Sequence, residues 1–254
     1  MKIQYASDLH LEFNQNTDWL AKMPLQVTGD VLVLAGDITI FGNPELENHP
    51  FFDWCSEHYR ETLLVPGNHE YYGGVEMRDT LTDFEKQLRP NVRYCNNRSV
   101  LIDDVEFFIT TLWSKVQSQN EAWIQRCMTD CRRNVLDGHA LRGNDYTPLH
   151  ELCFAWLDRA LRQSASLHKV VVTHHSPVNY EDPAFAKNNL ADAFIVNLEH
   201  YIAESGIDAW IFGHTHYNAA QGVKLGKTHI CTNQLGYVMY GICPGFDSAR
   251  FIEI

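Results

Sequence analysis

The chain has 254 residues, of which 45% are hydrophobic, enough for one α/β domain or for one domain with a sizeable insertion. Its formal net charge of −12 disfavours a long nucleic-acid track, because an acidic surface repels the phosphate backbone. The acidity does not exclude a small phosphate substrate, since bound divalent cations can set the local field of a site.

No stretch reaches the roughly 18 apolar residues that a membrane-spanning helix requires, and the N-terminus lacks the apolar core of a signal peptide. We therefore expect a cytoplasmic protein with no membrane partner. The seven cysteines are odd in number and include no C-x-x-C pair, so we interpret them as reduced thiols rather than as a structural zinc site.

Apolar runs of strand length recur along the chain. They cover residues 2–7, 31–35, 62–65, 105–112, 169–173, 209–212, 228–232, 237–240 and 250–254. Between them, apolar residues at three- and four-residue spacing predict helices over residues 75–88, 149–161 and 192–203, and Gly206 ends the last one. Strands that alternate with helices favour a layered α/β fold, and the closely spaced final strands predict antiparallel pairing near the C-terminus.

Residues 113–148 depart from this pattern, because they are polar and rich in Gln, Asn and Arg, with scattered aromatic residues. We interpret this segment as an insertion or cap near the mouth of a site, helical over residues 120–133, within a single domain that spans residues 1–254. The alternative is a disordered surface loop, against which the aromatic residues argue, since they favour packing.

Several of the expected strands end in residues that bind metal ions. The candidate ligands are Asp8, His10, Asp37, Asn68, His174, His214 and His216. The pairs at positions 8 and 10 and at 214 and 216 share a two-residue spacing, which puts both side chains on one side of an extended chain. A glycine precedes Asp37, Asn68 and His214, and it permits the backbone turn that would bring these side chains over the strand ends.

This set combines two carboxylates, one amide and four imidazoles. Such a mixture suits Mn²⁺, Fe, Zn²⁺ or Co²⁺ better than Ca²⁺ or a thiolate-bound metal. Seven ligands exceed what one tetrahedral ion needs, so we expect two divalent or transition metal ions that share a bridging carboxylate.

The ordered motifs Asp-x-His, Gly-Asp, Gly-Asn-His-Glu, a histidine after a strand, and Gly-His-x-His resemble the calcineurin-like metallophosphoesterase superfamily over residues 8–216. The resemblance implies a four-layer α/β/β/α sandwich of two mixed sheets flanked by helices, with the metal ions at the sheet ends. It also implies that Asp8, His10 and His216 bind one ion, that Asn68, His174 and His214 bind the other, and that Asp37 bridges the two.

Finer motifs resemble a group of small bacterial phosphohydrolases within this superfamily. They are Ser-Asp-Leu-His-Leu-Glu at residues 7–12 and Thr-Leu-Trp at residues 111–113. That group also carries Asn-Pro-x-Gly-Tyr, which Asn233, Gly236 and Tyr237 match. Gln234 replaces the proline, and this departure puts the conformation of the loop in doubt, though not the metal ligands.

The resemblance implies a binuclear metal-dependent phosphoric ester hydrolase in which a metal-activated hydroxide attacks phosphorus. His69 follows the ligand Asn68, and we interpret it as the catalytic residue that protonates the leaving oxygen or stabilises the transition state. The alternative is a structural histidine in a turn. The phosphoprotein phosphatases of the superfamily carry a further Asp and an Arg after Gly-Asp. Both are absent after Asp37, so a Ser/Thr protein phosphatase is disfavoured and His69 has no identified orienting partner.

A site without a phosphate-gripping arginine favours a small phosphodiester, such as a cyclic nucleotide, over a monoester, which carries one more negative charge. The alternatives are a phosphomonoesterase, with Arg126, Arg132 or Arg133 entering from the insertion, a metal-dependent nuclease, and a non-catalytic scaffold with the same fold. The expected partner is a small phosphate ester rather than extended nucleic acid, and the sequence indicates no oligomeric state.

Three residues beside the motifs are candidate substrate contacts. Tyr71 and Trp113 could stack on a base or an aryl leaving group, with packing in the core as the alternative. His175 follows the candidate ligand His174, and its alternative role is that of a structural turn residue.

Overall fold

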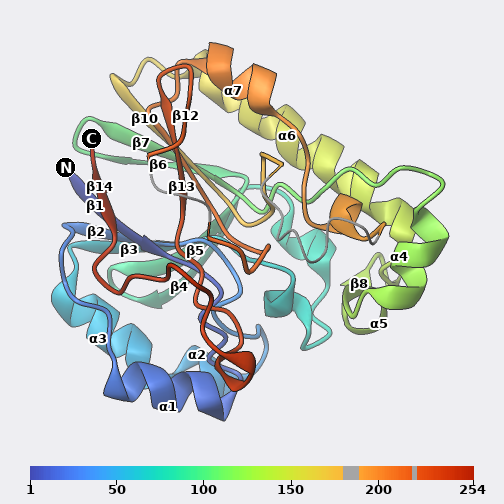
Figure 1. Cartoon of the computed structure of the whole chain (residues 1–254), viewed down its shortest axis with the longest axis horizontal. Coiled ribbons are helices and arrows are strands. Elements are labelled where there is room, and N and C mark those ends of the chain that lie inside the picture. Colours follow the sequence, from blue (N-terminus) through green and yellow to red (C-terminus); the bar gives the residue numbers. More distant parts are fainter. Residues whose placement is uncertain (180–188, 219–221) are drawn as a thin grey trace.

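The computed structural model describes residues 1–179, 189–218 and 222–254. In this part of the chain two six-stranded sheets lie against each other, and helices cover their outer faces (Figure 1). The expected fold of two mixed sheets flanked by helices is confirmed.

The first sheet has the strand order β14-β1-β2-β3-β5-β4. Its strands are β1 (Lys2–Ala6), β2 (Val31–Leu34), β3 (Glu61–Leu64), β4 (Phe84–Arg89), β5 (Val92–Asn96) and β14 (Phe251–Glu253). Its four central strands are parallel, whereas the edge strands β14 and β4 pair antiparallel. The carboxyl ends of the parallel strands therefore meet at one edge of the sheet.

The second sheet has the order β12-β13-β11-β10-β7-β6. Its strands are β6 (Arg98–Ile102), β7 (Val105–Thr110), β10 (His168–Thr173), β11 (Ala209–Phe212), β12 (Lys224–Leu225) and β13 (Thr228–Thr232). Here too the central strands are parallel and the edge strands antiparallel. The antiparallel pairing expected near the C-terminus is present in β12–β13 and in β14.

The helices cover the two outer faces of the sandwich. On the first sheet lie α1 (Asn14–Lys22), α2 (Pro44–Glu47) and α3 (Pro50–His58), and on the second lie α6 (Tyr146–Gln163) and α7 (Glu199–Ser205) (Figure 1). At one end lie α4 (Glu121–Cys127), α5 (Asp130–Arg133) and the hairpin of β8 (Val135–Leu136) and β9 (His139–Ala140). Short 3-10 turns are η1 (His69–Tyr71), η2 (Met77–Thr80), η3 (Gly143–Asp145), η4 (Ala191–Ala193) and η5 (Val238–Tyr240).

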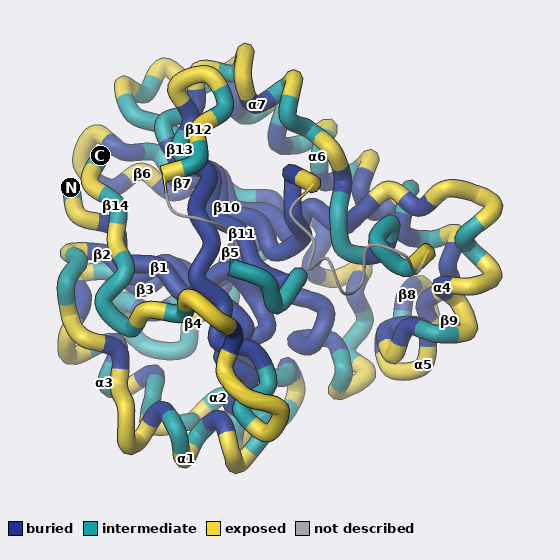
Figure 2. The backbone as a smooth tube through the Cα atoms, viewed as in Figure 1, coloured by how far each residue is buried: buried dark blue, intermediate teal, exposed yellow. Residues whose placement is uncertain are grey.

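The alternation of side chains along β2 shows how the layers are held. Val31 and Val33 pack between the two sheets, whereas Leu32 and Leu34 face the helical layer. All four are fully buried, because both faces of a central parallel strand are covered. The buried strands form the continuous dark interior of Figure 2, and this rigid interior holds the strand ends in place.

Two expected elements are wrong. The helix expected over residues 75–88 is instead η2 followed by the edge strand β4, whose residues alternate between half-buried and exposed. The apolar spacing did not distinguish the two, because pairing with β5 decides the conformation of this segment. The strand expected over residues 237–240 is the turn η5, which packs against α1.

Other elements differ only in extent. The helix expected over residues 192–203 begins later, as α7, although Gly206 ends it with a φ of 68°, as expected. The helix expected over residues 120–133 is divided into α4 and α5, because Met128 adopts an extended conformation. Among the described residues no helix is both long and apolar enough to cross a membrane.

Candidate metal centre

The seven expected ligands come together at the carboxyl ends of parallel strands from both sheets. Six are buried and His216 is partly exposed. Asp8 and His10 follow β1, Asp37 follows β2, and Asn68 follows β3. From the second sheet, His174 follows β10, and His214 and His216 follow β11. Strands that are parallel within each sheet thus bring together residues from distant parts of the chain.

One cluster contains Asp37, Asn68, His174 and His214. His174 Nε2 lies 3.1 Å from Asn68 Oδ1, 3.1 Å from His214 Nδ1 and 3.4 Å from Asp37 Oδ1. The other ring nitrogens are oriented by carbonyls, His174 Nδ1 at 2.8 Å from Ala35 O and His214 Nε2 at 3.3 Å from Ala193 O. Since those nitrogens donate, the facing nitrogens are free to present lone pairs to a cation.

The second cluster contains Asp8, His10 and His216. His10 Nε2 lies 3.1 Å from His216 Nε2, which lies 3.3 Å from Asp8 Oδ1. Glu12 Oε1 lies 3.0 Å from His10 Nδ1 and accepts a hydrogen bond from its N–H, so His10 Nε2 also presents a lone pair. Asp37 joins the two clusters, since its ligand atoms are close to His174 and His214 and also to His10 and His69.

Both clusters therefore aim several acceptor atoms at a common point. The amide nitrogen of Asn68 donates to Asp130 Oδ1 at 2.9 Å, which leaves the Asn68 oxygen to face His174. Converging acceptors repel each other unless a proton or a metal ion lies among them. The oxygen and imidazole donors present fit a divalent or transition metal ion.

The pKa values reflect the same field. Burial lowers the pKa of His174, but the charges of Asp37 and Asp8 and the hydrogen bonds with Asp37 and the Ala35 carbonyl together outweigh it and raise the pKa to about 9. Burial together with the charge of His174 lowers the pKa of His214 to about 3. The carboxylate of Asp37 is thus stabilised by one positive charge beside it. A proton on His174 supplies this charge here, and a metal ion would supply it when bound.

The backbone is strained where it presents these ligands. Positive φ angles occur at Asp8 (55°), His10 (49°), Asp37 (55°), His214 (73°) and His216 (48°). A non-glycine residue in this region costs on the order of 1–3 kcal/mol, and such strain clusters at functional sites. Five of the seven candidate ligands have this strained backbone, which indicates that the placement of their side chains takes precedence over a relaxed backbone.

His69 lies beside the two clusters. Its backbone N–H donates to Asp37 Oδ1 at 2.9 Å, its Nε2 lies 3.9 Å from Asp37 Oδ2, and its ring stacks on Tyr72 with a centroid distance of 4.1 Å. Its Nδ1 lies 2.7 Å from Glu12 Oε1. Burial lowers the pKa of His69, but the charges of Asp37 and Glu12 raise it to about 9.

Glu12, Glu70 and Tyr237 are site residues to which the sequence reasoning gave no role. Glu70 is fully buried, and it accepts hydrogen bonds from the backbone N–H groups of Asp37 and Gly67 and from the Tyr94 hydroxyl. It thereby fixes the loops that carry two of the candidate ligands. Burial raises its pKa to about 7. The Tyr237 hydroxyl lies 3.2 Å from His69 Nε2, and its ring stacks on His10.

A cavity of about 350 Å³ opens beside the clusters. Asp37, Asn68, His69, His214 and His216 line it from the sheet ends. The remaining lining residues are Tyr72, Cys127, Met128, Thr129, Asp130, Leu190, Ala191, Phe194, Ile195, Thr215 and Tyr237. The segment 113–148 therefore supplies part of one wall. Tyr237 also lines the cavity, and the sequence motif around it could have revealed it as a site candidate.

Asp130 connects this segment to the candidate ligands. It is fully buried, its Oδ1 accepts from Asn68 Nδ2 at 2.9 Å and from the Tyr72 hydroxyl at 2.6 Å, and its Oδ2 accepts from the Tyr146 hydroxyl at 2.7 Å. The segment thus holds the side chain of Asn68 in the orientation that turns its oxygen toward His174.

The three expected substrate contacts lie in the packed interior. Tyr71 and Trp113 are fully buried, and the Tyr71 hydroxyl pairs with Thr80 Oγ1 at 2.7 Å. Neither lines the cavity, so in this structure both take the alternative role of core packing. His175 is also fully buried, between Trp113 and His214, and its ring nitrogens have no hydrogen-bond partner among the described residues. Burial holds its pKa well below the usual range.

Gln234, which stands where the related motif has proline, holds the loop of His214 and His216. Its Oε1 accepts from the backbone N–H of His216 at 2.6 Å, and its Nε2 donates to Thr215 Oγ1 and to Tyr217 O, each at 3.0 Å. The departure from the motif therefore supports the position of a candidate ligand.

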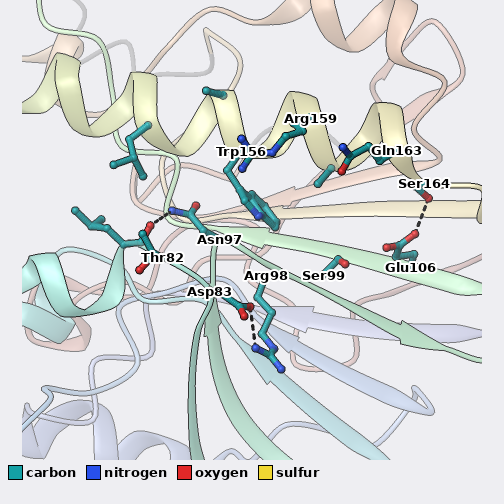
Figure 3. A pocket seen from close by; sticks show the side chains of 14 residues that line it. Thr82, Asp83, Asn97, Arg98, Ser99, Glu106, Trp156, Arg159, Gln163 and Ser164 are labelled. Carbon is teal, nitrogen blue, oxygen red and sulfur yellow. Dashed lines mark hydrogen bonds and ion pairs between the residues drawn. The ribbon is translucent and has the colours of Figure 1, made fainter.

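A larger cavity of about 860 Å³ lies between α6 and the edge of the second sheet. Its lining includes Arg98, Glu106, Trp156 and Arg159 (Figure 3). None of the candidate ligands lines it. The strained backbone and the converging acceptors are found instead at the smaller cavity, which we take as the functional site.

Comparisons with known proteins agree with this architecture. Residues 1–218 match the family described as calcineurin-like phosphoesterase. An uncharacterized protein of Acanthamoeba polyphaga mimivirus is 31% identical over 262 residues, covering 92% of this chain and 91% of the relative.

Two solved structures are similar at 14% identity, which shows the fold alone. Phosphopantetheinyl hydrolase from Mycobacterium tuberculosis superposes with a TM-score of 0.64, covering 93% of this chain and 89% of that one. The protein TT1561 of Thermus thermophilus superposes with a TM-score of 0.52, covering 92% of this chain and 88% of that one.

Proposed function

This chain belongs to the calcineurin-like phosphoesterase family, and from that premise we propose that it hydrolyses a small phosphodiester at a centre of two divalent cations. The observation that carries the proposal is the convergence of imidazole, carboxylate and amide acceptors at two adjoining points joined by Asp37. A family member that had lost catalysis would have no need to keep both sets of donors and the strained backbone that presents them.

In this proposal Asp8, His10 and His216 hold one ion, and Asn68, His174 and His214 hold the other, with Asp37 between them. The mixed oxygen and nitrogen donors suit Mn²⁺, Fe, Zn²⁺ or Co²⁺. Two such ions would lower the pKa of a water molecule and neutralise charge on the phosphoryl oxygens.

His69 is the residue that we assign to the leaving group. It lines the cavity, and its Nε2 is directed toward the cavity-lining Tyr237 hydroxyl at 3.2 Å and away from the partner of its Nδ1. As the bond from phosphorus to the leaving oxygen breaks, that oxygen takes the electron pair and His69 Nε2 supplies the proton.

The walls of the cavity favour a diester over a monoester. None of the described residues that line it is Lys or Arg, and Met128, Phe194 and Ile195 make much of the wall apolar. Of the arginines in segment 113–148, Arg133 lies over the Tyr72 ring and Arg132 bonds to Thr129. A singly charged ester with an apolar or aromatic alcohol group fits these walls better than a dianion does.

We also propose that residues 113–148 act as a cap of a single domain, because this segment lines the cavity through Met128 and Asp130. The net charge of −12 remains the argument against the nuclease alternative, since extended nucleic acid would be repelled.

The test compares two chromogenic substrates after the purified protein has been stripped of metal and reloaded with Mn²⁺. We expect faster Mn²⁺-dependent hydrolysis of bis-p-nitrophenyl phosphate than of p-nitrophenyl phosphate. Preference for the monoester would replace the proposal with a phosphomonoesterase. No hydrolysis of either substrate by protein with two bound ions would favour the scaffold alternative.

A further inference from the structure

Glu12 has an unusual environment for a carboxylate. It follows β1 in the chain, its side chain is 7% exposed, and its Oε1 lies 3.0 Å from His10 Nδ1 and 2.7 Å from His69 Nδ1. Its second oxygen, Oε2, is buried with no hydrogen-bond partner among the described residues. One oxygen atom of Glu12 thus receives the N–H groups of two imidazoles.

This arrangement is costly unless the two histidines need it. A buried carboxylate oxygen without a partner loses the hydration that it has in water, and this loss destabilises the folded state. The contacts of Glu12 with His10 and His69 are the feature that offsets the cost.

The contacts with Glu12 hold both imidazole rings in the same orientation, with Nδ1 toward the carboxylate. Because each Nδ1 donates to Glu12, each Nε2 faces away from it: His10 Nε2 toward His216 Nε2 at 3.1 Å, and His69 Nε2 toward the Tyr237 hydroxyl at 3.2 Å. The two rings lie edge to face with a centroid distance of 4.5 Å. Moving Glu12 would therefore turn a candidate metal ligand and the candidate proton donor together.

We propose that Glu12 is a positioning residue that ties the proton donor His69 to the metal ligand His10 through one shared carboxylate oxygen. The inference rests on the proposed function of the site and adds to it the orienting partner that the sequence did not identify. In the reaction Glu12 touches neither substrate nor metal. It holds His69 so that the proton on Nε2 reaches the leaving oxygen when the bond to phosphorus breaks.

The first experiment measures how Glu12→Gln changes the dependence of turnover on the leaving group, with bound metal quantified in every sample. Proton donation matters less for p-nitrophenolate, which leaves easily, than for phenolate. We expect kcat to fall about tenfold or more on diphenyl phosphate and by less than about threefold on bis-p-nitrophenyl phosphate. An equal loss on both substrates would overturn the proposal.

The second experiment combines Glu12→Gln with His69→Ala. If Glu12 acts through His69, adding Glu12→Gln to His69→Ala should lower kcat by less than about twofold, because coupled residues are non-additive. A loss in the His69→Ala background as large as in the wild type would show that Glu12 has a merely structural role. Glu106→Gln is the matched control. Glu106 is a half-buried carboxylate that accepts from Ser164 at the larger cavity (Figure 3) and also from Ser166.

A third measurement tests the contact without turnover and separates the two proposals. In protein labelled with ¹⁵N-histidine and loaded with Zn²⁺, we expect two hydrogen-bonded Nδ1–H resonances that shift in Glu12→Gln and stay unchanged in Glu106→Gln. If neither resonance responds to Glu12→Gln, the positioning role is wrong even if the enzyme is active. If both respond in a protein that hydrolyses no ester, the proposed function fails while the geometric link stands.

Discussion

Both clusters depend on the side chain of Asp37. It lies close to His174 and His214 on one side and to His10 and His69 on the other. Burial raises the pKa of Asp37, but the charges of His174, His69 and His10 and the hydrogen bond with His174 together hold it well below the usual range. A buried carboxylate so placed is the natural link between two cations.

We therefore expect Asp37→Ala to abolish activity and the pairing of the metals together. Metal content by elemental analysis and hydrolysis of bis-p-nitrophenyl phosphate check this. A variant that kept two ions per chain would contradict the bridging role.

His69→Ala separates chemistry from metal binding. The ring of His69 lies beside the clusters but belongs to neither proposed ligand set, so the variant should keep both ions and lose about 10²–10⁴-fold in kcat on a poor leaving group. Elemental analysis with steady-state kinetics measures both effects. An emptied metal position would show that His69 is a ligand rather than a proton donor.

Gly36 is required for the room that it leaves to a neighbouring side chain as well as for its backbone conformation. A Cβ at Gly36 would lie 2.2 Å from His174 Nδ1, whereas a Cβ at Gly74 would meet nothing within 4 Å. Both have positive φ angles, 89° and 77°, so alanine is strained at either position. The comparison of the two therefore isolates the clash.

Gly36→Ala should lower the free energy of unfolding by about 1–3 kcal/mol more than Gly74→Ala, since the ring of His174 must move to admit the methyl group. Urea denaturation of both variants measures the difference. Equal destabilisation would mean that the ring has room to shift without cost.

At the scale of elements, segment 113–148 is joined to the site through Asp130, whose carboxylate bonds to Asn68, Tyr72 and Tyr146. Asp130→Asn removes the negative charge and replaces one of the two acceptor oxygens with an amide N–H₂ group, which donates. The three groups that donate to Asp130 would then have one oxygen left to accept from them. Asn68 would lose its orientation, and with it the cluster of Asp37, Asn68, His174 and His214 would lose one oxygen ligand.

We expect Asp130→Asn to weaken the binding of one of the two ions about 10–100-fold, as loss of an orienting partner does at other metal sites. Calorimetric titration with Mn²⁺ into stripped protein would detect the weakened site. Asp137→Asn is the matched control in the same segment, because the ion pair of Asp137 with Arg78 is half exposed and contributes little. Equal metal binding by both variants would contradict the link.

The fold places charged side chains and strained backbone together at the carboxyl ends of the parallel strands of both sheets. Metal ions that bind there should stabilise the native state. Ions that bind the native state at a free concentration near 100 times Kd would add about 2.7 kcal/mol for one site. For a chain of this size that corresponds to a rise in Tm of about 5–10 °C.

Thermal unfolding with and without a chelator measures this rise. The Asp37→Ala variant should show little or no shift, because it lacks the shared carboxylate. A wild-type Tm that is indifferent to Mn²⁺ would argue that no ion binds in the native state.

Local sequence determined much of the site and the fold. Each candidate ligand follows an apolar run that forms a parallel strand, and such strands place their carboxyl ends together, so the constellation could be predicted from Asp8 to His216. The conformation of β4 could not be predicted, because its apolar spacing suits a helix as well as a strand and only pairing with β5 decides between them. The seven candidate ligands were recognisable by residue type and position alone.

Only the tertiary structure decided which residues support those ligands. Glu12 meets His69 across 57 positions in the chain, and Asp130 meets Asn68 across 62. The side chain of Tyr237 reaches His69 across 168. Contacts of this range leave no periodicity in a sequence, because they depend on where separate strands and turns come to rest. For the same reason the burial of Trp113 and Tyr71 could not be distinguished from a place in the cavity until the layers were packed.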